Sequence, residues 1–148
     1  CQCKDVSNRF FAMPGARTRC IGFQLFKYDV KGFLHWGYNF YYSQYSISFV
    51  NPYLDSTGNY FAPSGDCYSV YPAQNGEAYE SIRLTAFYEA LEDMRACELC
   101  SSLIGKKQTV ALLESVLGEI RFDRCASSSA TLLAARQKIN EAIENALK

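Results

Sequence analysis

The spacing of apolar residues along the chain predicts four helices. Apolar side chains recur every three or four positions in four separate stretches, which is the period of one helix face. A proline opens the first stretch, a glycine follows the second, and serines are available to cap the last, and these are residue types that favour helix ends. The predicted helices cover about Pro14–Tyr28, Glu80–Ile104, Gln108–Arg121 and a last segment that begins at Ser127–Ser129.

Two short apolar runs interrupt this helical pattern and predict strands. Phe33–Trp36 suits a strand buried on both faces, and Cys67–Tyr71 predicts a second strand that ends at Pro72. The residues between them, Gly37–Asp66, contain too many Asn, Asp, Pro and Gly residues for a long regular element. We therefore expect a long, tyrosine-rich loop, and loops of this length inside a domain are usually functional.

The order of these elements predicts an α/β fold. Helix, strand, loop, strand and helix imply βα units and a parallel sheet, but two parallel strands cannot cover their own edges. We therefore predict the C-terminal portion of a (β/α)8 TIM-type barrel, with its N-terminal part upstream of Cys1, followed by amphipathic C-terminal helices. Residues 1–105 would form the incomplete barrel, and residues 106–148 a helical extension that packs on the same domain. Active-site groups would lie where the strands end, at His35–Asn39 and Tyr71–Pro72.

Composition and charge narrow the class of partner. The 15 Lys and Arg residues balance 15 Asp and Glu residues, so the chain has no net positive charge that would attract nucleic acid or an anionic membrane. No apolar run approaches the roughly 20 residues of a membrane helix, so we expect no membrane insertion. The 10 Phe, 11 Tyr and 1 Trp residues crowd into the first 88 positions, and only Phe122 follows. An aromatic half therefore precedes a plain helical half.

The cysteines do not indicate a disulfide framework. There are 7 of them, an odd number at irregular spacing, so we expect most to be reduced thiols. Cys97 and Cys100 form a C-x-x-C within a predicted helix, but the sequence offers no second pair to complete a tetrahedral zinc site. We predict no metal and no cofactor. The cysteines are at positions 1, 3, 20, 67, 97, 100 and 125.

The end of the first predicted strand carries the best candidates for a binding site. His35, Trp36, Tyr38 and Asn39 alternate polar and flat aromatic side chains. A sugar offers an apolar face that stacks on a ring and a rim of hydroxyls that need hydrogen-bond partners, so this mixture suits it. Tyr71, at the end of the second predicted strand, is a further candidate. The alternative is that these side chains form an aromatic core with one buried histidine.

Other polar residues favour structural roles. Asp66 is expected to hold the long loop by accepting hydrogen bonds from backbone N–H groups. Arg19 is expected to be solvated or paired with a nearby carboxylate, whereas the role of Arg83, close to the predicted site, stays open. Glu92 and Asp93 are adjacent carboxylates, but they lie within a helix far from the strand ends and do not face each other. We therefore assign them no catalytic role.

Three segments carry a resemblance to a known family. GFLHWGYNF, NPYLDSTGNYFAPSGDCYSVYP and SIRLTAFYEALEDMRACELC occur in this order, and together they resemble the C-terminal part of the glycoside hydrolase family 123 catalytic domain, formerly a domain of unknown function. The similarity runs from about Asn8 through Leu103, with a weaker match in LLAARQKINEAIENAL. Ala90 departs from the family pattern, which tends to have Gly there, and we expect this change to affect packing.

The resemblance implies a barrel enzyme that removes terminal β-linked N-acetylgalactosamine from a glycan with retention of configuration. In that mechanism the substrate's own 2-acetamido oxygen attacks the anomeric carbon, and an adjacent Asp-Glu pair of the enzyme supplies the acid and the orienting carboxylate. No residue of this chain matches that pair, so the resemblance assigns no catalytic residue here and implies that the chain alone is inactive. The resemblance implies a sugar-binding role for His35, Trp36, Tyr38, Asn39 and Tyr71. A non-catalytic carbohydrate-binding module and a purely structural domain are the alternatives.

Overall fold

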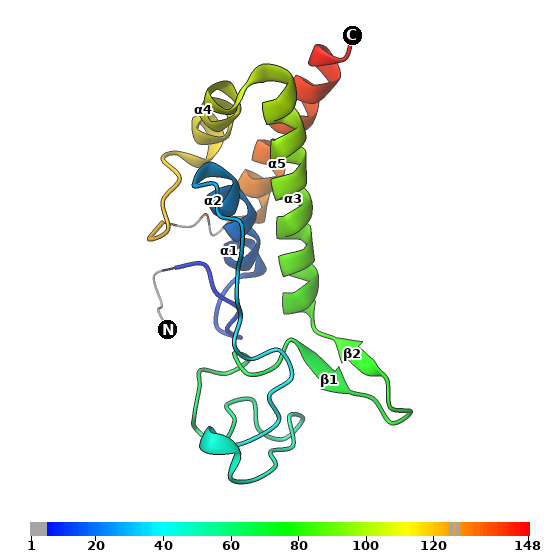
Figure 1. Cartoon of the computed structure of the whole chain (residues 1–148). Coiled ribbons are helices and arrows are strands. Elements are labelled where there is room, and N and C mark those ends of the chain that lie inside the picture. The colour runs from blue at the N-terminus through cyan, green and yellow to red at the C-terminus, as the bar shows by residue number, and fades with distance from the viewer. Residues whose placement is uncertain (1–5, 125, 127) are drawn as a thin grey trace.

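The computed structural model describes residues 6–124, 126 and 128–148. The molecule has two regions (Figure 1). One is a stack of helices, which we call the helical half. The other, residues 33–72, is mostly irregular, and we call it the aromatic lobe. Within the described ranges the elements are α1 (Gly15–Arg19), α2 (Ile21–Lys27), the 3-10 turn η1 (Gln44–Ser46), β1 (Val70–Pro72), β2 (Ala78–Glu80), α3 (Ile82–Ile104), α4 (Lys106–Leu117) and α5 (Ser129–Ala146).

The long helix α3 is the centre of the helical half. The helices α1, α2, α4 and α5 all contact it, and its first turn is capped by Ser81, whose hydroxyl accepts a hydrogen bond from the N–H of Leu84 at 3.2 Å. Apolar faces of these helices meet in one core, as their helical periodicity predicts. Its most deeply buried members are Phe23, Cys97, Cys100, Leu113, Leu132, Ala135 and Ile139.

Helices α2 and α3 approach each other very closely at one point. A Cβ atom added to Gly22 would lie 2.0 Å from the backbone oxygen of Ala90, so a glycine is needed at position 22 for this packing. Ala90 itself is fully buried in a small cluster with Ile21 and Leu25. Position 90 is therefore a tightly packed helix contact.

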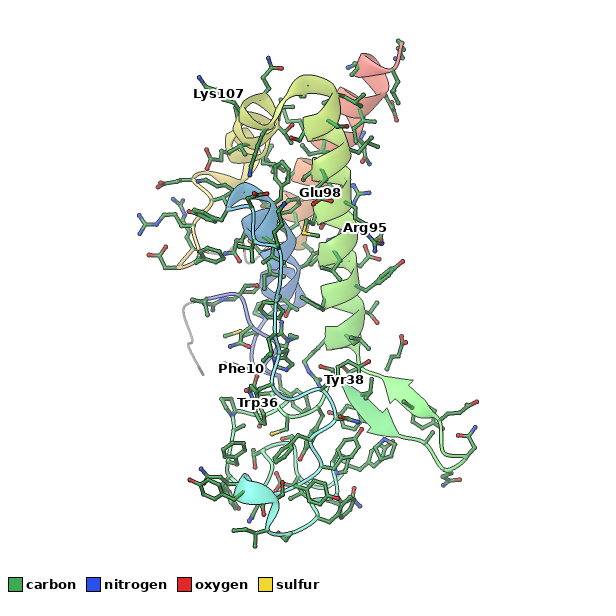
Figure 2. The ribbon with its side chains drawn as sticks, viewed as in Figure 1. Phe10, Trp36, Tyr38, Arg95, Glu98 and Lys107 are labelled. Carbon is green, nitrogen blue, oxygen red and sulfur yellow. The ribbon has the colours of Figure 1, made fainter. Side chains whose placement is uncertain are left out.

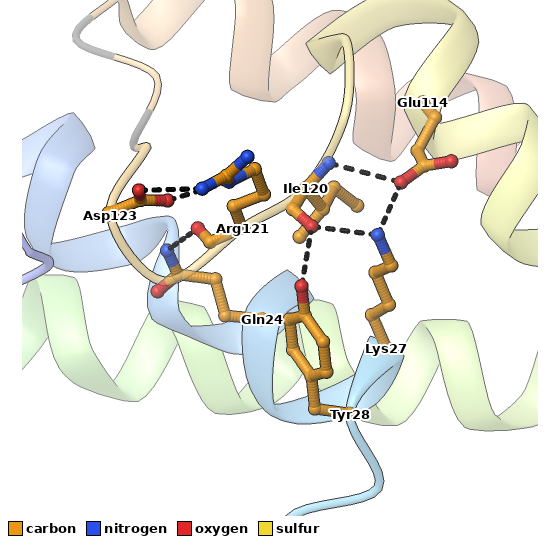
Figure 3. A network of polar contacts seen from close by, with 7 residues as sticks. All are labelled: Gln24, Lys27, Tyr28, Glu114, Ile120, Arg121 and Asp123. Carbon is orange, nitrogen blue, oxygen red and sulfur yellow. Dashed lines mark hydrogen bonds and ion pairs between the residues drawn. The ribbon is translucent and has the colours of Figure 1, made fainter.

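Polar groups tie α2 to the connection between α4 and α5 (Figure 3). The Lys27 ammonium donates to Glu114 Oε1 and to the carbonyl of Ile120, each at 2.7 Å, and the Tyr28 hydroxyl donates to the same carbonyl at 3.0 Å. Glu114 also accepts from the N–H of Ile120 at 3.0 Å. These bonds satisfy both backbone groups of Ile120, which lies outside any helix, and they hold this residue against α2.

The prediction of a (β/α)8 barrel portion is wrong. Among the described residues, the sheet has two strands, and they pair antiparallel with the register Val70↔Glu80, Tyr71↔Tyr79 and Pro72↔Ala78. The expected parallel strand over Phe33–Trp36 is instead an irregular segment at the start of the aromatic lobe, with Phe33 and Leu34 exposed. A four-residue apolar run carries no period that separates a buried strand from such a segment.

The helical predictions fare better than the strand predictions. The 23-residue helix α3 and its end at Gly105 are confirmed, as is a last helix, although Ser127 lies outside the described residues. The first predicted helix is divided into α1 and α2 at Cys20. The second predicted strand begins three residues late, at Val70.

The described cysteines, Cys20, Cys67, Cys97 and Cys100, are all buried, and the last three are free thiols, as expected of reduced core residues. Cys1, Cys3 and Cys125 lie outside the described residues. Burial raises the pKa of the Cys97 thiol far above its usual range, so this member of the C-x-x-C is protonated. The described ranges hold no group of three His, Cys, Asp or Glu side chains that could bind a metal ion. In the same ranges, no helix is long and apolar enough to cross a membrane.

Candidate functional site

His35 lies between an arginine and a backbone carbonyl. Its Nδ1 is 2.7 Å from Arg9 Nη2, and its Nε2 is 3.0 Å from the carbonyl oxygen of Asp66. A guanidinium only donates and a carbonyl only accepts, so Nδ1 must accept and Nε2 must carry the proton. Burial, and then the positive charge of Arg9, lower the pKa of His35. The imidazole is therefore neutral near pH 7, and both of its nitrogens are occupied.

Trp36 combines a fixed orientation with an open surface. Its indole N–H donates to Asp66 Oδ2 at 3.0 Å, and the rings of Phe40 and Phe61 meet it edge-on at centroid distances of 5.6 and 5.3 Å. The residue nevertheless keeps 42% of its surface exposed. A ring that is held at its polar edge and flanked by two others needs little ordering when a flat, apolar ligand face stacks on it.

Asp66 binds a different partner from the one expected. It is buried, but its carboxylate accepts from the indole of Trp36. The task of holding loop N–H groups falls to Asp55, which accepts from the N–H of Thr57 at 2.7 Å and of Asn59 at 2.8 Å. The hydrogen bonds from Thr57 lower the pKa of Asp55. Sequence reasoning assigned the right role to the wrong aspartate.

Tyr38 and Asn39 present their side chains outward while their backbone is fixed. The carbonyl of Tyr38 accepts from the N–H of Ser69 at 2.6 Å, and Asn39 forms an antiparallel bridge with Tyr68. The preceding Gly37 lets the two segments come together, because a Cβ at this position would lie 2.8 Å from the carbonyl oxygen of Asp66. Both side chains are exposed, 49% in the case of Tyr38, and are free to meet a ligand.

Tyr71 belongs to a second group of side chains. Its hydroxyl accepts from Arg83 Nη2 at 3.3 Å, and its ring lies 5.5 Å from that of Tyr53 and 5.9 Å from that of Tyr68. Arg83 also donates to the carbonyl of Tyr68 and stacks over Phe11 at 4.5 Å. The open role of Arg83 is thus an orienting one. Tyr71 is the middle residue of β1, not the last residue of a parallel strand.

The structure therefore joins some of the predicted site residues and separates others. His35 and Trp36 meet at Asp66, and Tyr38 and Asn39 follow them directly along the chain. Tyr71 lies with Arg83 instead. Figure 2 shows Trp36 and Tyr38 where the connection from the helical half enters the aromatic lobe. His35, Trp36 and Asn39 thus contact Asp66 and Tyr68, whereas Tyr71 belongs to β1 and contacts Arg83, Tyr53 and Tyr68.

Two buried side chains beneath the predicted site residues are uncharged. Tyr68 and Cys67 are completely buried between them. Burial raises the pKa of Tyr68 to about 12 and that of Cys67 to about 11, so both groups stay protonated in neutral solution. Both side chains therefore contribute neutral, buried surface beneath the exposed residues.

The carboxylates of the region are already engaged. Asp55 and Asp66 are the acidic residues of the aromatic lobe, and each accepts hydrogen bonds from the loop itself. In α3, Asp93 is completely buried and accepts from Arg19 at 2.6 and 2.9 Å and from Arg136 at 2.8 Å, which makes it a structural ion-pair centre. This agrees with the paired state expected for Arg19.

Two exposed tyrosines of the lobe have a strained backbone. Tyr45 has a φ of 60° and Tyr60 a φ of 62°, in the left-handed region that a bulky side chain rarely adopts. Their side chains are 84% and 93% exposed, so burial of the rings does not explain the strain. Strain held at exposed aromatic residues is typical of segments that are shaped for a ligand.

Sequence reasoning missed Arg9 altogether. It stands between Asn8 and Phe10 near the start of the chain, and no spacing rule connects it to His35, which is 26 positions away. A lone arginine next to Phe10 and Phe11 is a weak sign of a buried cation. Beside this segment the surface has a hollow of about 430 Å³, lined by Phe10, Phe11, Met13, Gly15, Thr18, Ile82, Arg83 and Ala86.

Comparison with known families supports the resemblance found in the sequence. The model of the glycoside hydrolase 123 catalytic domain matches residues 1–100, which include the whole aromatic lobe, the five predicted site residues and most of α3. A search of the curated proteins finds no match. The match covers about two thirds of the 148 residues. The chain therefore belongs to the family of the glycoside hydrolase 123 catalytic domain.

Proposed function

We propose that this chain supplies the sugar-binding surface of a retaining glycoside hydrolase that acts on terminal β-N-acetylgalactosaminides. The observation that carries the proposal is Trp36, whose ring is held by Asp66 and remains 42% exposed. A galacto-configured ring has a face of C–H groups that stacks on an indole, and its hydroxyl and acetamido groups need polar partners nearby. Tyr38 and Asn39, exposed next to Trp36, supply them.

The proposed reaction is assisted by the substrate. The 2-acetamido oxygen attacks the anomeric carbon as the glycosidic bond breaks, an acid gives its proton to the leaving oxygen, and a carboxylate orients the acetamido group. Water then opens the cyclic intermediate, and the configuration is retained. This scheme needs two carboxyl groups at the sugar, whereas Asp55 and Asp66 already bind groups of the loop. We infer that the acid and the orienting carboxylate come from another part of the catalytic domain, so that this chain alone does not hydrolyse the substrate.

The helices after Gly105 fit the role of a support. Helices α4 and α5 contact each other and α3, and their apolar faces join the core beneath α2. We propose that residues 106–148 extend the same domain and take no part in sugar binding. Tyr71 lies in β1 beside Arg83 and is proposed to contact a more distant part of the glycan.

The proposal is tested most directly through Trp36, because it is the one tryptophan of the sequence. Its fluorescence should change on titration with N-acetylgalactosamine and change less with a sugar of a different configuration. In the complete enzyme, Trp36→Ala should lower kcat/KM for a chromogenic β-N-acetylgalactosaminide by about tenfold or more, which corresponds to about 1.4 kcal/mol of lost binding. The matched control is Tyr88→Ala, an exposed aromatic residue of α3 outside the lobe.

Two results would contradict the proposal. Equal losses of turnover in Trp36→Ala and Tyr88→Ala would mean that Trp36 affects activity only through folding. Unchanged fluorescence at saturating sugar would mean that the indole is not at the site. If the complete protein binds the sugar and hydrolyses no β-N-acetylgalactosaminide, the alternative of a non-catalytic carbohydrate-binding module is favoured, and the engaged state of Asp55 and Asp66 is the observation that supports it.

A further inference from the structure

Arg9 is a buried cation in an unusual setting. Only 5% of its surface is exposed, and its guanidinium lies 5.0 Å from the ring of Phe33 and 5.3 Å from that of Phe87. Among the described residues, its Nε has no hydrogen-bond partner, and its Nη2 contacts the neutral His35. Burying a charge is costly unless specific contacts compensate it. The contacts of Arg9 are therefore central to its role.

The contacts of Arg9 continue as a chain to Trp36. Arg9 donates to Nδ1 of His35, Nε2–H of His35 donates to the carbonyl of Asp66, and the carboxylate of Asp66 accepts from the indole N–H of Trp36. The three links are 2.7, 3.0 and 3.0 Å long. They join the N-terminal segment, the segment 33–36 and the loop at 66, which are distant in the sequence.

We propose that Arg9 is a positioning residue, which sets the orientation of Trp36 through His35 and Asp66. The role of this orientation in sugar binding rests on the proposed function, whereas the positioning itself does not. Arg9 fixes the tautomer and the plane of the imidazole, because only an acceptor at Nδ1 can face a guanidinium. The imidazole in turn holds residue 66, whose side chain holds the indole.

This arrangement also makes the indole sensitive to pH. A proton added to His35 would turn Nδ1 into a donor that faces the donors of Arg9, so the first link would break. The charged groups that act on the imidazole are Arg9, from the N-terminal segment, and Asp66, from the loop. Burial and Arg9 lower the pKa of His35, while Asp66 raises it less. The link is therefore intact at neutral pH and is lost in acid, below the ordinary histidine value of about 6.5.

The experiment follows the indole N–H of Trp36 by NMR in the 15N-labelled chain. The sequence has one tryptophan, so it gives one indole signal. In the unaltered chain this signal should move with pH, with a midpoint below about 6.5. Arg9→Met keeps the apolar stem but removes the charge and the donor. It should displace the signal at neutral pH and raise the midpoint towards 6.5, because the positive charge that opposes protonation is gone.

Controls separate positioning from a general loss of structure. Arg95→Met alters an exposed arginine of α3 that pairs with Glu92, and it should leave both the signal and the midpoint unchanged (Figure 2). If Arg9→Met fails to fold, Arg9→Lys keeps the charge and a donor, and it should displace the signal less and leave the midpoint low. An indole signal and a midpoint that stay the same in a folded Arg9 variant would overturn the proposal.

The same samples distinguish this inference from the proposed function. N-acetylgalactosamine should move the signal of the unaltered chain, and Arg9→Met should weaken its apparent affinity by about tenfold, with saturation still reached at higher sugar concentration. If the sugar moves no signal while the pH response depends on Arg9, the proposed function fails and the positioning role stands. If the sugar binds and Arg9→Met changes neither the signal nor the affinity, the positioning role fails and the proposed function stands.

Discussion

The helical half and the aromatic lobe use apolar residues in opposite ways. In the helical half, large apolar side chains such as Phe23, Leu113 and Ile139 form a buried core around a paired interior charge, Asp93. A smaller share of its large apolar side chains, such as Ile82 and Leu133, is exposed. In the aromatic lobe many large apolar side chains lie on the surface. They are Phe33, Leu34, Trp36, Tyr38, Tyr42, Tyr45, Ile47, Phe49, Tyr53, Leu54 and Tyr60. The first arrangement stabilises a fold, and the second holds rings where another molecule can reach them.

The two regions also differ in how the backbone is satisfied. Helices satisfy their own N–H and C=O groups, so the side chains of the helical half are left to form the core. In the lobe, side chains such as Asp55 and Ser43 accept from backbone N–H groups instead. The lobe therefore keeps its shape through polar contacts around a small buried cluster of Ala62, Cys67 and Tyr68, and its exposed rings can be changed with little loss of stability.

The largest expected effect concerns the buried charge of the helical half. Asp93→Ala removes the carboxylate that accepts from Arg19 and Arg136, and it leaves two cations without their shared partner. Breaking one side of a buried ion pair typically costs about 3–5 kcal/mol. Urea unfolding should show this loss. The control Glu92→Ala, which removes the exposed partner of Arg95, should cost less than about 1 kcal/mol. Equal losses in both variants would remove the distinction between a buried and an exposed pair.

A smaller loss is expected where two helices of the same half touch. Gly22→Ala places a Cβ 2.0 Å from the carbonyl oxygen of Ala90, and backbone atoms cannot move aside as a flexible side chain does. Overpacking of this kind costs about 1–3 kcal/mol. Gly15→Ala in α1 is the matched control, since nothing lies within 4 Å of its added Cβ. Helix propensity should make that variant more stable by up to about 1 kcal/mol. Opposite signs in thermal melting are the diagnostic result.

The helices could be predicted from the sequence because their signals are local. The apolar period from about Glu80 onward and the glycine at position 105 define α3 without any knowledge of its neighbours. The strand pairing could not be predicted, because β2 has one large side chain, Tyr79, in three residues. Without β2, the predicted sheet contained only Phe33–Trp36 and Cys67–Tyr71. The order of the predicted elements implied that these two strands are parallel, and the parallel pairing led to the prediction of a barrel.

The candidate site was predictable only in part, for a similar reason. An alternation of polar and flat aromatic residues drew attention to the segment from His35 to Asn39, and these residues do lie together. Their partners Arg9 and Asp66 come from distant segments, and tertiary contacts of this kind leave no spacing in the sequence. The charge of Asp66 was visible, but its bond to an indole depends on how the loop folds back.

The smallest expected effect has the opposite sign and tests the aromatic lobe. Tyr60 has a φ of 62° and is 93% exposed, so its ring adds strain and little packing. Tyr60→Asn places a residue that tolerates the left-handed region at this position, and it should stabilise the chain by up to about 1 kcal/mol in urea unfolding. Tyr88→Asn in α3 is the control, since Tyr88 is also exposed but has a helical backbone, and it should bring no gain. If Tyr60→Asn is stabilising and also weakens glycan binding, the lobe retains a strained, exposed ring at the expense of stability. A Tyr60→Asn variant that loses stability would mean that the exposed tyrosine helps to hold the lobe together, and the contrast between the two halves would no longer hold at this residue.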